Sequence, residues 1–119
     1  MGTHNDPRID RALDWMREQL HRQLTNAELA GIARLSVAQF TRLFKRSTGM
    51  TPHVFLHQLR IARARILVER TDLPVSVIMA QVGISDRSHF ARNFRAIHGV
   101  SPRALRMELR PAHTRPRAG

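Results

Sequence analysis

Two short segments of the chain combine small residues with arginines in a pattern that suits contact with nucleic acid. When the first segment is drawn as a helix with about 100° per residue, one side presents Ala38, Thr41, Arg42 and Lys45. A guanidinium group pairs with phosphates and with the edge of guanine, and small neighbours allow a helix to lie close inside a major groove. An ordinary solvated face would be rich in Glu and Lys, and neither segment contains a Glu. This face favours contact with double-stranded DNA.

The second segment lies fifty residues further along and repeats the pattern, and its corresponding side consists of Ser88, Ala91, Arg92 and Arg95. We expect Arg42 and Arg92 to read bases or clamp the groove, and the remaining cations to bind phosphates. For His89 the pattern leaves a DNA contact and a packing role equally open. The predicted DNA-binding residues are Ala38, Thr41, Arg42, Lys45, Arg46, Arg87, Ser88, His89, Arg92 and Arg95.

The opposite sides of the same two helices are mainly apolar and are expected to pack into a core. Phenylalanine pairs at helical spacing are far more often core anchors than platforms on which single-stranded bases stack. Asn93 is a polar imperfection on the second of these sides. The expected packing residues are Phe40, Leu43, Phe44 and Ser47 in the first segment, and Phe90, Phe94 and Ile97 in the second.

An internal repeat is the most specific feature of the sequence. Residues 40–45 are echoed by residues 90–95, and residues 49–52 by residues 99–102, at a constant shift of fifty positions. The serine ahead of the first copy has its counterpart at a shift of forty-nine, so the second copy contains one extra residue at its cap. Each copy has the signals of a short helix, a tight turn and a second helix, which is the helix-turn-helix pattern.

Helix signals, and no strand signals, surround the first copy. Apolar residues at helical spacing predict an amphipathic helix over 8–22. The next helix opens with a capping-box pattern, in which Thr25 accepts a hydrogen bond from the helix and Glu28 reaches back to the cap. A turn follows at Arg34 and Leu35. A left-handed Arg34 would cost on the order of 1 kcal/mol, which favours a turn of a different shape.

The second helix of the first copy has clear signals at both ends. Ser36 and Gln39 form another capping box, and Gly49 can adopt the left-handed conformation that ends a helix. Pro52 suits the first turn of a helix, and a helical apolar stripe continues from there to about Arg70. We therefore expect a long helix between the two copies.

The second copy has similar signals: a start at residues 72–74, a turn at Gly83, a cap at Ser85 or Asp86, an end at Gly99, and a last helix from Ser101 to about Arg110. The sequence thus predicts an all-α fold with two helix-turn-helix subdomains joined by a long connecting helix. The expected parts are an N-terminal helix with the first subdomain at 8–50, the connecting helix at 51–71, the second subdomain at 72–110 and a basic flexible tail at 111–119.

The charge is strongly positive and unevenly distributed. Twenty Lys and Arg residues stand against nine Asp and Glu, and nineteen of the cations are Arg. Residues 29–68 contain seven cations and no carboxylate, whereas the first 28 residues contain five acids and four bases. A surface that only confers solubility would mix the two signs throughout. The expected partner is therefore a polyanion such as DNA.

Several classes of function find no support in the residue types. The 119 residues include no cysteine, no glycine-rich nucleotide loop and no catalytic constellation, so we expect neither enzymatic activity nor a cofactor. His53 and His57 lie four apart and could share a metal, but nothing nearby completes a site, and surface histidines are the usual reading. No apolar run is long enough to cross a bilayer and no signal peptide opens the chain, so the expected location is the bacterial cytoplasm, at the nucleoid.

Four groups of residues follow one another along the chain: Ser36-x-x-x-Phe40-x-Arg42-x-Phe44-Lys45; Gly49-x-Thr51-Pro52; Leu59-Arg60-x-x-x-Ala64-Arg65-x-Leu67; and Gly83-Ile84-Ser85-Asp86-x-Ser88-His89-Phe90-x-Arg92-x-Phe94-Arg95 with Gly99-x-Ser101-Pro102. With these motifs, residues 8–110 resemble the DNA-binding region of the AraC/XylS family of bacterial transcription regulators. The sequence departs from the family at Arg34, where the first turn often has Gly, at Met79, where a small residue is usual, and at Asn93, where an apolar one is expected.

The resemblance implies two helix-turn-helix subdomains, each of which places its second helix in a major groove. A connecting helix of roughly nineteen residues spans about 28 Å, so two recognition helices at its ends could reach groove segments about 34 Å apart. A single chain, bound as a monomer, would then contact both segments. The chain has no room for a separate sensing domain, so we expect either a short stand-alone regulator or a fragment of a longer one.

Two questions stay open from the sequence. The high positive charge would equally serve a non-specific architectural protein or an RNA-binding protein, and comparing affinities for cognate and random duplex at a stated salt concentration separates these from a specific regulator. The first helix has Asp10, Asp14 and Glu18 on one side. By family resemblance such a surface could face RNA polymerase, whereas the simpler interpretation is that these acids keep the helix soluble.

Overall fold

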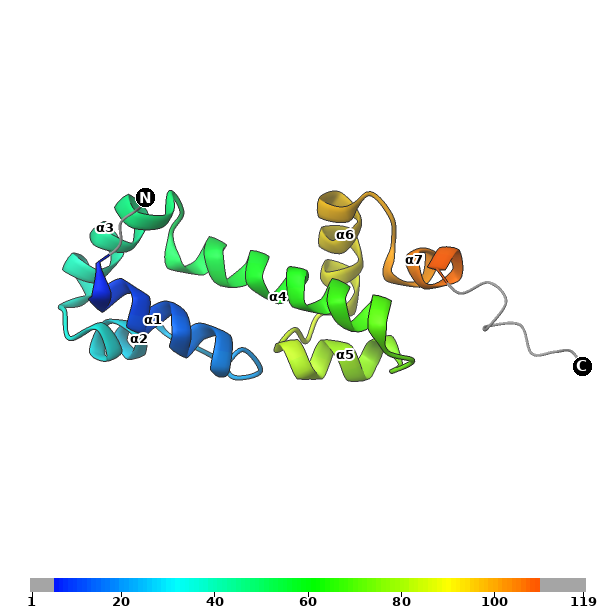
Figure 1. The fold of residues 1–119 in the computed structure, drawn as a ribbon, viewed down its shortest axis with the longest axis horizontal. Helices are drawn as coiled ribbons and strands as arrows, with labels where there is room; N and C mark the ends of the chain where they lie inside the picture. The colour runs from blue at the N-terminus through cyan, green and yellow to red at the C-terminus, as the bar shows by residue number, and fades with distance from the viewer. Residues whose placement is uncertain (1–5, 110–119) are drawn as a thin grey trace, which may run out of the picture. The chain divides into compact units, whose positions relative to one another are not determined.

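The computed structural model describes residues 6–109, so the predicted tail at 111–119 and the predicted helix end near Arg110 lie outside the described residues. Within that range the chain forms seven helices and no strand, as expected for an all-α fold (Figure 1). The helices are α1 (Pro7–Glu18), α2 (Asn26–Ala33), α3 (Val37–Thr48), α4 (Pro52–Arg70), α5 (Val75–Val82), α6 (Arg87–His98) and α7 (Pro102–Leu109).

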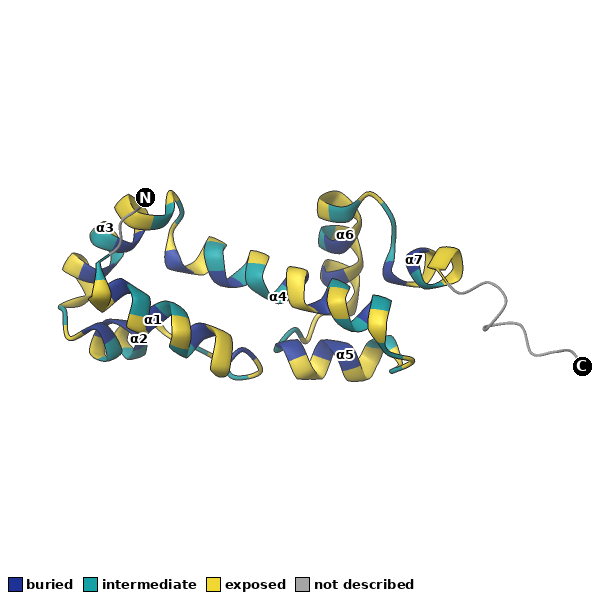
Figure 2. Cartoon of the chain, in the orientation of Figure 1, coloured by how far each residue is buried: buried dark blue, intermediate teal, exposed yellow. Residues whose placement is uncertain are grey.

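The described residues form two compact units, which divide between Leu59 and Arg60 inside α4. Each unit has its own apolar core, visible as the buried positions in Figure 2. The α4 helix contributes Leu56 to the first core and Ile61, Ala64 and Val68 to the second. The remaining buried residues are Ile9, Ala12, Met16, Leu20, Leu29, Ala30, Ala33, Phe40 and Phe44 in the first core, and Ile78, Met79, Val82, Phe90, Phe94 and Leu105 in the second.

The first helix is shorter than the predicted range 8–22. It begins at Pro7, capped by the Asp6 carboxylate, and ends at Glu18, because Gln19 leaves the helical conformation with φ −110° and ψ 27°. Leu20 nevertheless lies in the first core. The chain turns directly after the helix, where the Arg22 N–H donates to the Gln19 carbonyl at 3.0 Å.

The turn after α1 brings together a polar cluster that the sequence patterns do not reveal. Thr25 caps α2 as predicted, accepting from the Glu28 N–H at 3.1 Å. The Glu28 carboxylate, however, does not complete the predicted capping box. It accepts from Trp15 Nε1 at 2.7 Å and from the two terminal nitrogens of Arg22 at 3.0 and 3.2 Å. A charged guanidinium and an indole N–H outcompete a backbone amide for this carboxylate, so Glu28 ties α2 to α1 and to the turn between them.

This cluster predicts a loss of stability in acid. Hydrogen bonds from Arg22 and then from Trp15 hold the pKa of the Glu28 carboxyl below its ordinary value of 4.5. The folded state thus prefers the ionised form, so the stabilisation is complete above that ordinary value and disappears as the pH falls through the lower folded-state pKa. We expect the Glu28→Gln variant to be less stable than the wild type at neutral pH and nearly as stable at a pH below the folded-state pKa.

Urea unfolding at several pH values, followed by fluorescence of Trp15, the single tryptophan, measures this difference. Arg8 also lowers the pKa of Asp6, to about 2, but that pair is present in both proteins and cancels in the comparison. A gap between wild type and variant that stays constant across the acid range would contradict the role assigned to Glu28.

The turn between α2 and α3 is left-handed despite the cost expected from the sequence. Arg34 has φ 61° and ψ 44°, and it is the one described residue other than glycine with a positive φ. Its N–H donates to the Gly31 carbonyl at 3.1 Å, and the next N–H, of Leu35, donates to Ala30 at 2.9 Å. These bonds satisfy the last carbonyls of α2, and Leu35 packs against the first core, so the tertiary structure imposes the strained conformation.

Exchanging residues at the two turns should move stability in opposite directions. Gly83 occupies the equivalent turn of the second unit at φ 79°. We expect Arg34→Gly to raise the free energy of unfolding by up to about 1 kcal/mol, because glycine adopts this conformation without strain. Gly83→Ala should lower it by about 1 kcal/mol for the same reason. Chemical denaturation of both variants checks the pair, and a destabilised Arg34→Gly protein would show that the turn is not strained.

The helices of the second unit begin and end near the predicted caps, and the structure decides between the two candidate caps of α6. Asp86, and not Ser85, caps α6, with its carboxylate accepting from the His89 N–H at 2.9 Å. Gly99 ends the helix at φ 85°. Arg106 of α7 donates through Nε to the Val68 carbonyl at 3.3 Å and through Nη1 to the Leu73 carbonyl at 2.6 Å. Among residues 6–109, no helix is both long and apolar enough to cross a membrane.

Candidate nucleic-acid interface

Phenylalanine side chains fix the orientation of α3 in the first unit. Phe40 and Phe44 are fully buried, their rings lie 5.5 Å apart, and the Phe44 ring meets Phe55 of α4 edge-on at 5.4 Å. Leu43 packs partly against the same core. Ser47, which the periodicity places with this packing side, is exposed instead, since the core closes around Phe44 and leaves the last turn in solvent.

The opposite side of α3 presents the predicted binding residues to solvent. Ala38, Arg42, Lys45 and Arg46 are exposed, and Thr41 is half-buried. The Thr41 hydroxyl donates to the carbonyls of the preceding turn, at 3.1 and 3.2 Å, which fixes the side chain on the helix surface. Ser36 and Gln39 form the predicted capping box at the start of the helix. The structure therefore brings all five predicted residues of α3 onto a single accessible surface.

The α6 helix repeats this arrangement in the second unit. Phe90 and Phe94 are buried with their rings 5.7 Å apart. Ile97, which the spacing assigns to the core, is 48% exposed, and His98 packs against Phe94 instead, with the ring centres 4.6 Å apart. A helix of twelve residues on so small a core buries only one narrow stripe of side chains. In the last turn of α6, His98 lies on this stripe and Ile97 does not.

The predicted binding residues of α6 are all exposed: Arg87, Ser88, His89, Arg92 and Arg95. His89 is exposed, so its side chain does not lie in the buried interior of the second unit. Asn93, the polar residue on the packing side, is half-buried and donates from Nδ2 to the His89 carbonyl at 2.8 Å. This bond satisfies the amide locally and lets the helix tolerate it beside the core.

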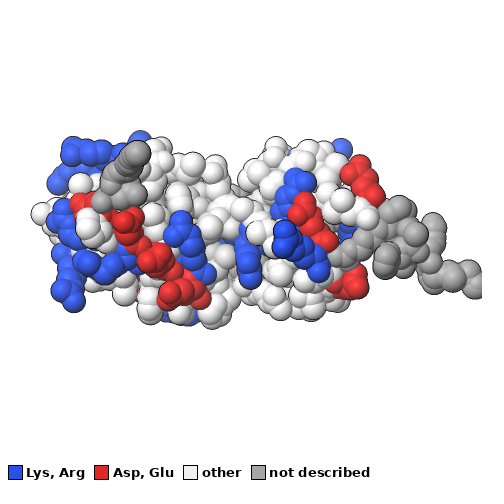
Figure 3. All heavy atoms as spheres, in the orientation of Figure 1, with Lys and Arg blue, Asp and Glu red and all other residues white. Residues whose placement is uncertain are grey.

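The charge on these two faces is not neutralised within the described residues. The ion pairs that the structure describes join Arg8 to Asp6, Arg17 to Asp14, Arg22 to Glu28 and Arg65 to Glu69. All of them lie outside α3 and α6. In the first unit, Figure 3 shows acidic side chains in a row over α1 and basic side chains gathered over α3. The positive potential of α3 is therefore available to an external anion.

Comparison of the two copies identifies a surface residue that the patterns do not single out. Val37, the first residue of α3, is 45% exposed and corresponds to Arg87, the first residue of α6. Gln39 corresponds in turn to His89, but the Gln39 side chain is engaged in the helix cap, where its Oε1 accepts from the Ser36 N–H at 3.2 Å. The fifty-residue shift already pairs these positions in the sequence, so this signal could have identified Val37.

The described residues give no support for a metal site at the two histidines of α4. His53 is exposed and His57 half-buried on α4. Within residues 6–109, no three side chains of His, Asp or Glu come together in the way that a metal ion requires.

Known proteins with similar sequences are transcription regulators. Residues 29–108 match the sequence family described as helix-turn-helix domain. Over 105 residues the chain is 33% identical to the "HTH-type transcriptional activator RhaS" of Klebsiella pneumoniae (strain 342), a match that covers 88% of this chain. The chain spans only 38% of the length of that relative.

Solved structures give the same result over nearly the whole chain. A transcriptional regulator with an AraC-type DNA-binding domain, from Chromobacterium violaceum, is 28% identical with a TM-score of 0.79, and the match covers 92% of this chain and 96% of that one. The DNA-binding domain of AdpA, solved in complex with a target DNA, is 30% identical with a TM-score of 0.81, covering 92% and 97%. With its repeated motifs, its all-α fold and these matches, the chain belongs to the AraC/XylS family of transcription regulators and forms the helix-turn-helix region of that family.

Proposed function

We propose that this protein binds specific sequences in double-stranded DNA and thereby regulates transcription in a bacterium. The observation that supports this most directly is the pair of exposed, arginine-containing and carboxylate-free faces on α3 and α6, each held in place by two buried phenylalanines. The relatives support the same function, since RhaS is a transcriptional activator and AdpA forms a complex with its target DNA. The protein acts by binding and not by catalysis, at the DNA of the bacterial cytoplasm.

Each recognition helix contributes base contacts from its centre and phosphate contacts from its flank. Arg42 and Arg92 read bases or clamp the groove, because an arginine can bind the two acceptors of guanine at once. Val37 adds an exposed apolar group that suits a thymine methyl. Small and polar residues line the groove, namely Ala38, Thr41, Arg87, Ser88 and His89. Phosphates are bound by Lys45, Arg46 and Arg95.

A single chain contacts two successive segments of the major groove, as a monomer. The proposed parts are the N-terminal helix and first subdomain at 8–50, the connecting helix at 51–71 and the second subdomain at 72–110. Each unit presents one recognition helix on its own core, so the duplex sets the distance between them, about 34 Å for neighbouring groove segments.

Selection of bound sequences from a random duplex library, followed by footprinting, tests this function. We expect the selected duplex to bind at least a thousandfold more tightly than random duplex at physiological salt, as specific regulators do, and the footprint to include two groove segments. Affinities for selected and random duplex that stay within a few-fold of each other across salt concentrations would replace this function with a non-specific architectural role.

The face of α1 that carries Asp10, Asp14 and Glu18 is proposed to contact RNA polymerase once the protein is bound to DNA. Asp14 and Glu18 are exposed and Asp10 is half-buried on this helix, and carboxylates beside a phosphate backbone would be repelled. We expect charge reversal at Asp14 and Glu18 to lower transcription output while DNA affinity stays unchanged. Output that equals the wild type in a reporter assay would show that these acids only keep the helix soluble.

A further inference from the structure

The second unit contains a cavity that shares Arg87 with the proposed DNA-binding face but is otherwise lined by residues with no role assigned above. It has a volume of about 430 Å³, within the range of roughly 300–1,000 Å³ that is common for ligand sites. Its lining consists of Val75, Arg87, Pro102, Arg103, Arg106 and Met107. Three of these six residues are arginines and none is acidic, so the cavity has a positive potential.

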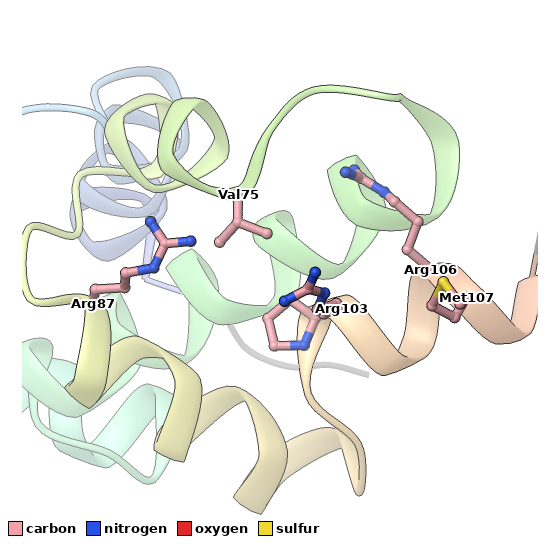
Figure 4. A pocket seen from close by; sticks show the side chains of 6 residues that line it. Val75, Arg87, Arg103, Arg106 and Met107 are labelled. Carbon is pink, nitrogen blue, oxygen red and sulfur yellow. The ribbon is translucent and has the colours of Figure 1, made fainter. Parts of the chain in front are cut away.

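The arginines approach the cavity from two helices. Figure 4 shows the guanidinium groups of Arg87 and Arg103 pointing toward the same space beside Val75. Both side chains are exposed, and neither forms an ion pair with another residue that the structure describes. Arg106 is half-buried and is held by the carbonyls of Val68 and Leu73, so its position is fixed before any ligand arrives.

Three helices begin at the wall of this cavity. Val75 is the first residue of α5, Arg87 of α6 and Pro102 of α7. A helix N-terminus carries a partial positive charge and backbone N–H groups without partners in the helix, and it favours anions. Side chains cap α6 and α7, whereas no side chain caps α5. The Asp86 carboxylate offsets the charge of the α6 end, so the uncapped start of α5 adds most to the field of the arginines.

We propose that this cavity binds a phosphate group, and that in the DNA complex it takes a backbone phosphate beside the second recognition helix. Guanidinium groups and helix N-termini both match a phosphate, which offers several acceptor oxygens. Arg87 connects the cavity to the binding face, since it opens the first turn of α6 together with Ser88 and His89. This inference rests on the proposed DNA-binding function and adds Arg103 to the residues that perform it, while Arg106, which donates to the carbonyls of Val68 and Leu73, forms part of the cavity wall.

The salt dependence of DNA affinity tests the inference. Each phosphate that a protein neutralises adds about 0.9 to the slope of log K against log salt. We expect Arg103→Gln to lower that slope by about 1, and to weaken selected and random duplex alike by roughly tenfold at about 0.1 M salt. Val75→Phe, which places a bulky ring in the space beside Arg87 and Arg103 and removes no charge, should do the same. Arg17→Gln, an equal charge change on α1, is the control and should leave the slope unchanged.

A second measurement uses the protein without DNA. Inorganic phosphate is titrated while the arginine Nε–H signals are followed by NMR, with chloride at equal ionic strength as the control. Saturable shifts that disappear in Arg103→Gln support a phosphate site. Such shifts, combined with an unchanged DNA slope, assign the cavity to a free phosphate compound instead of the duplex.

Other outcomes overturn the inference. It fails if phosphate produces no saturable shift and Arg103→Gln leaves the slope unchanged. It also fails if Arg103→Gln lowers the slope but a folded Val75→Phe protein does not, because Arg103 then contacts a phosphate outside the cavity. Failure of the proposed function looks different, since the wild type would then show no preference for selected over random duplex.

Discussion

The Phe44→Ala variant is expected to lose about 3–5 kcal/mol of its free energy of unfolding. Phe44 is fully buried and its ring contacts Phe40 at 5.5 Å and Phe55 at 5.4 Å, so truncation opens a cavity that rigid neighbours cannot fill. A unit of about sixty residues has only a few kcal/mol to lose, so we expect the first unit to be largely unfolded at room temperature. Urea titrations followed by Trp15 fluorescence report this directly, because Trp15 packs against the same core.

Two further variants show whether the effect belongs to the core. Phe44→Leu keeps most of the buried volume and should be substantially less destabilised than the alanine variant. Ser47→Ala lies one turn further on the same helix but is exposed, and should change stability by no more than about 0.5 kcal/mol. A Ser47→Ala protein as unstable as Phe44→Ala would mean that α3 packs as the periodicity suggests and not as the structure has it.

The Arg92→Ala variant is expected to bind its selected duplex about 1–3 kcal/mol more weakly, while random duplex is affected much less. Arg92 is exposed on α6 and has no carboxylate partner among residues 6–109, so its removal should leave the folded protein intact. Specificity should relax at one base position, since one side chain reads one position. Arg42→Ala should give the same result at a position in the other half of the site.

Arg95→Ala is the matched comparison on the same helix. It removes an equal charge, but from the flank where a phosphate contact is proposed, so selected and random duplex should weaken by the same factor. Binding titrations at two salt concentrations, together with a repeated sequence selection, distinguish the two behaviours. If Arg92→Ala and Arg95→Ala weaken all duplexes equally, Arg92 binds only phosphate and the base-reading role is wrong.

Much of the architecture follows from short-range features of the sequence. The ends of α4 coincide with the predicted Pro52 and Arg70, and glycines take left-handed conformations at the predicted ends of α3 and α6. The Ser36 capping box is present as expected. These features depend on hydrogen bonds and backbone conformations within a few residues, and both copies of the repeat show such local signals. The sides of α3 and α6 that face solvent were predictable for the same reason, because two buried phenylalanines fix the rotation of each helix.

The sequence by itself determined the all-α fold, the two helix-turn-helix units and the exposed arginine faces, since helical periodicity and capping are local properties. Only the tertiary structure decided that Glu28 binds Trp15, thirteen residues away, and that Arg34 adopts a strained turn. It also decided that Ile97 faces solvent and that the first residues of three helices line one cavity together with further arginines. Such contacts depend on where separate helices come to lie once the cores have packed. A local pattern contains no information about the partner that a side chain meets across that distance.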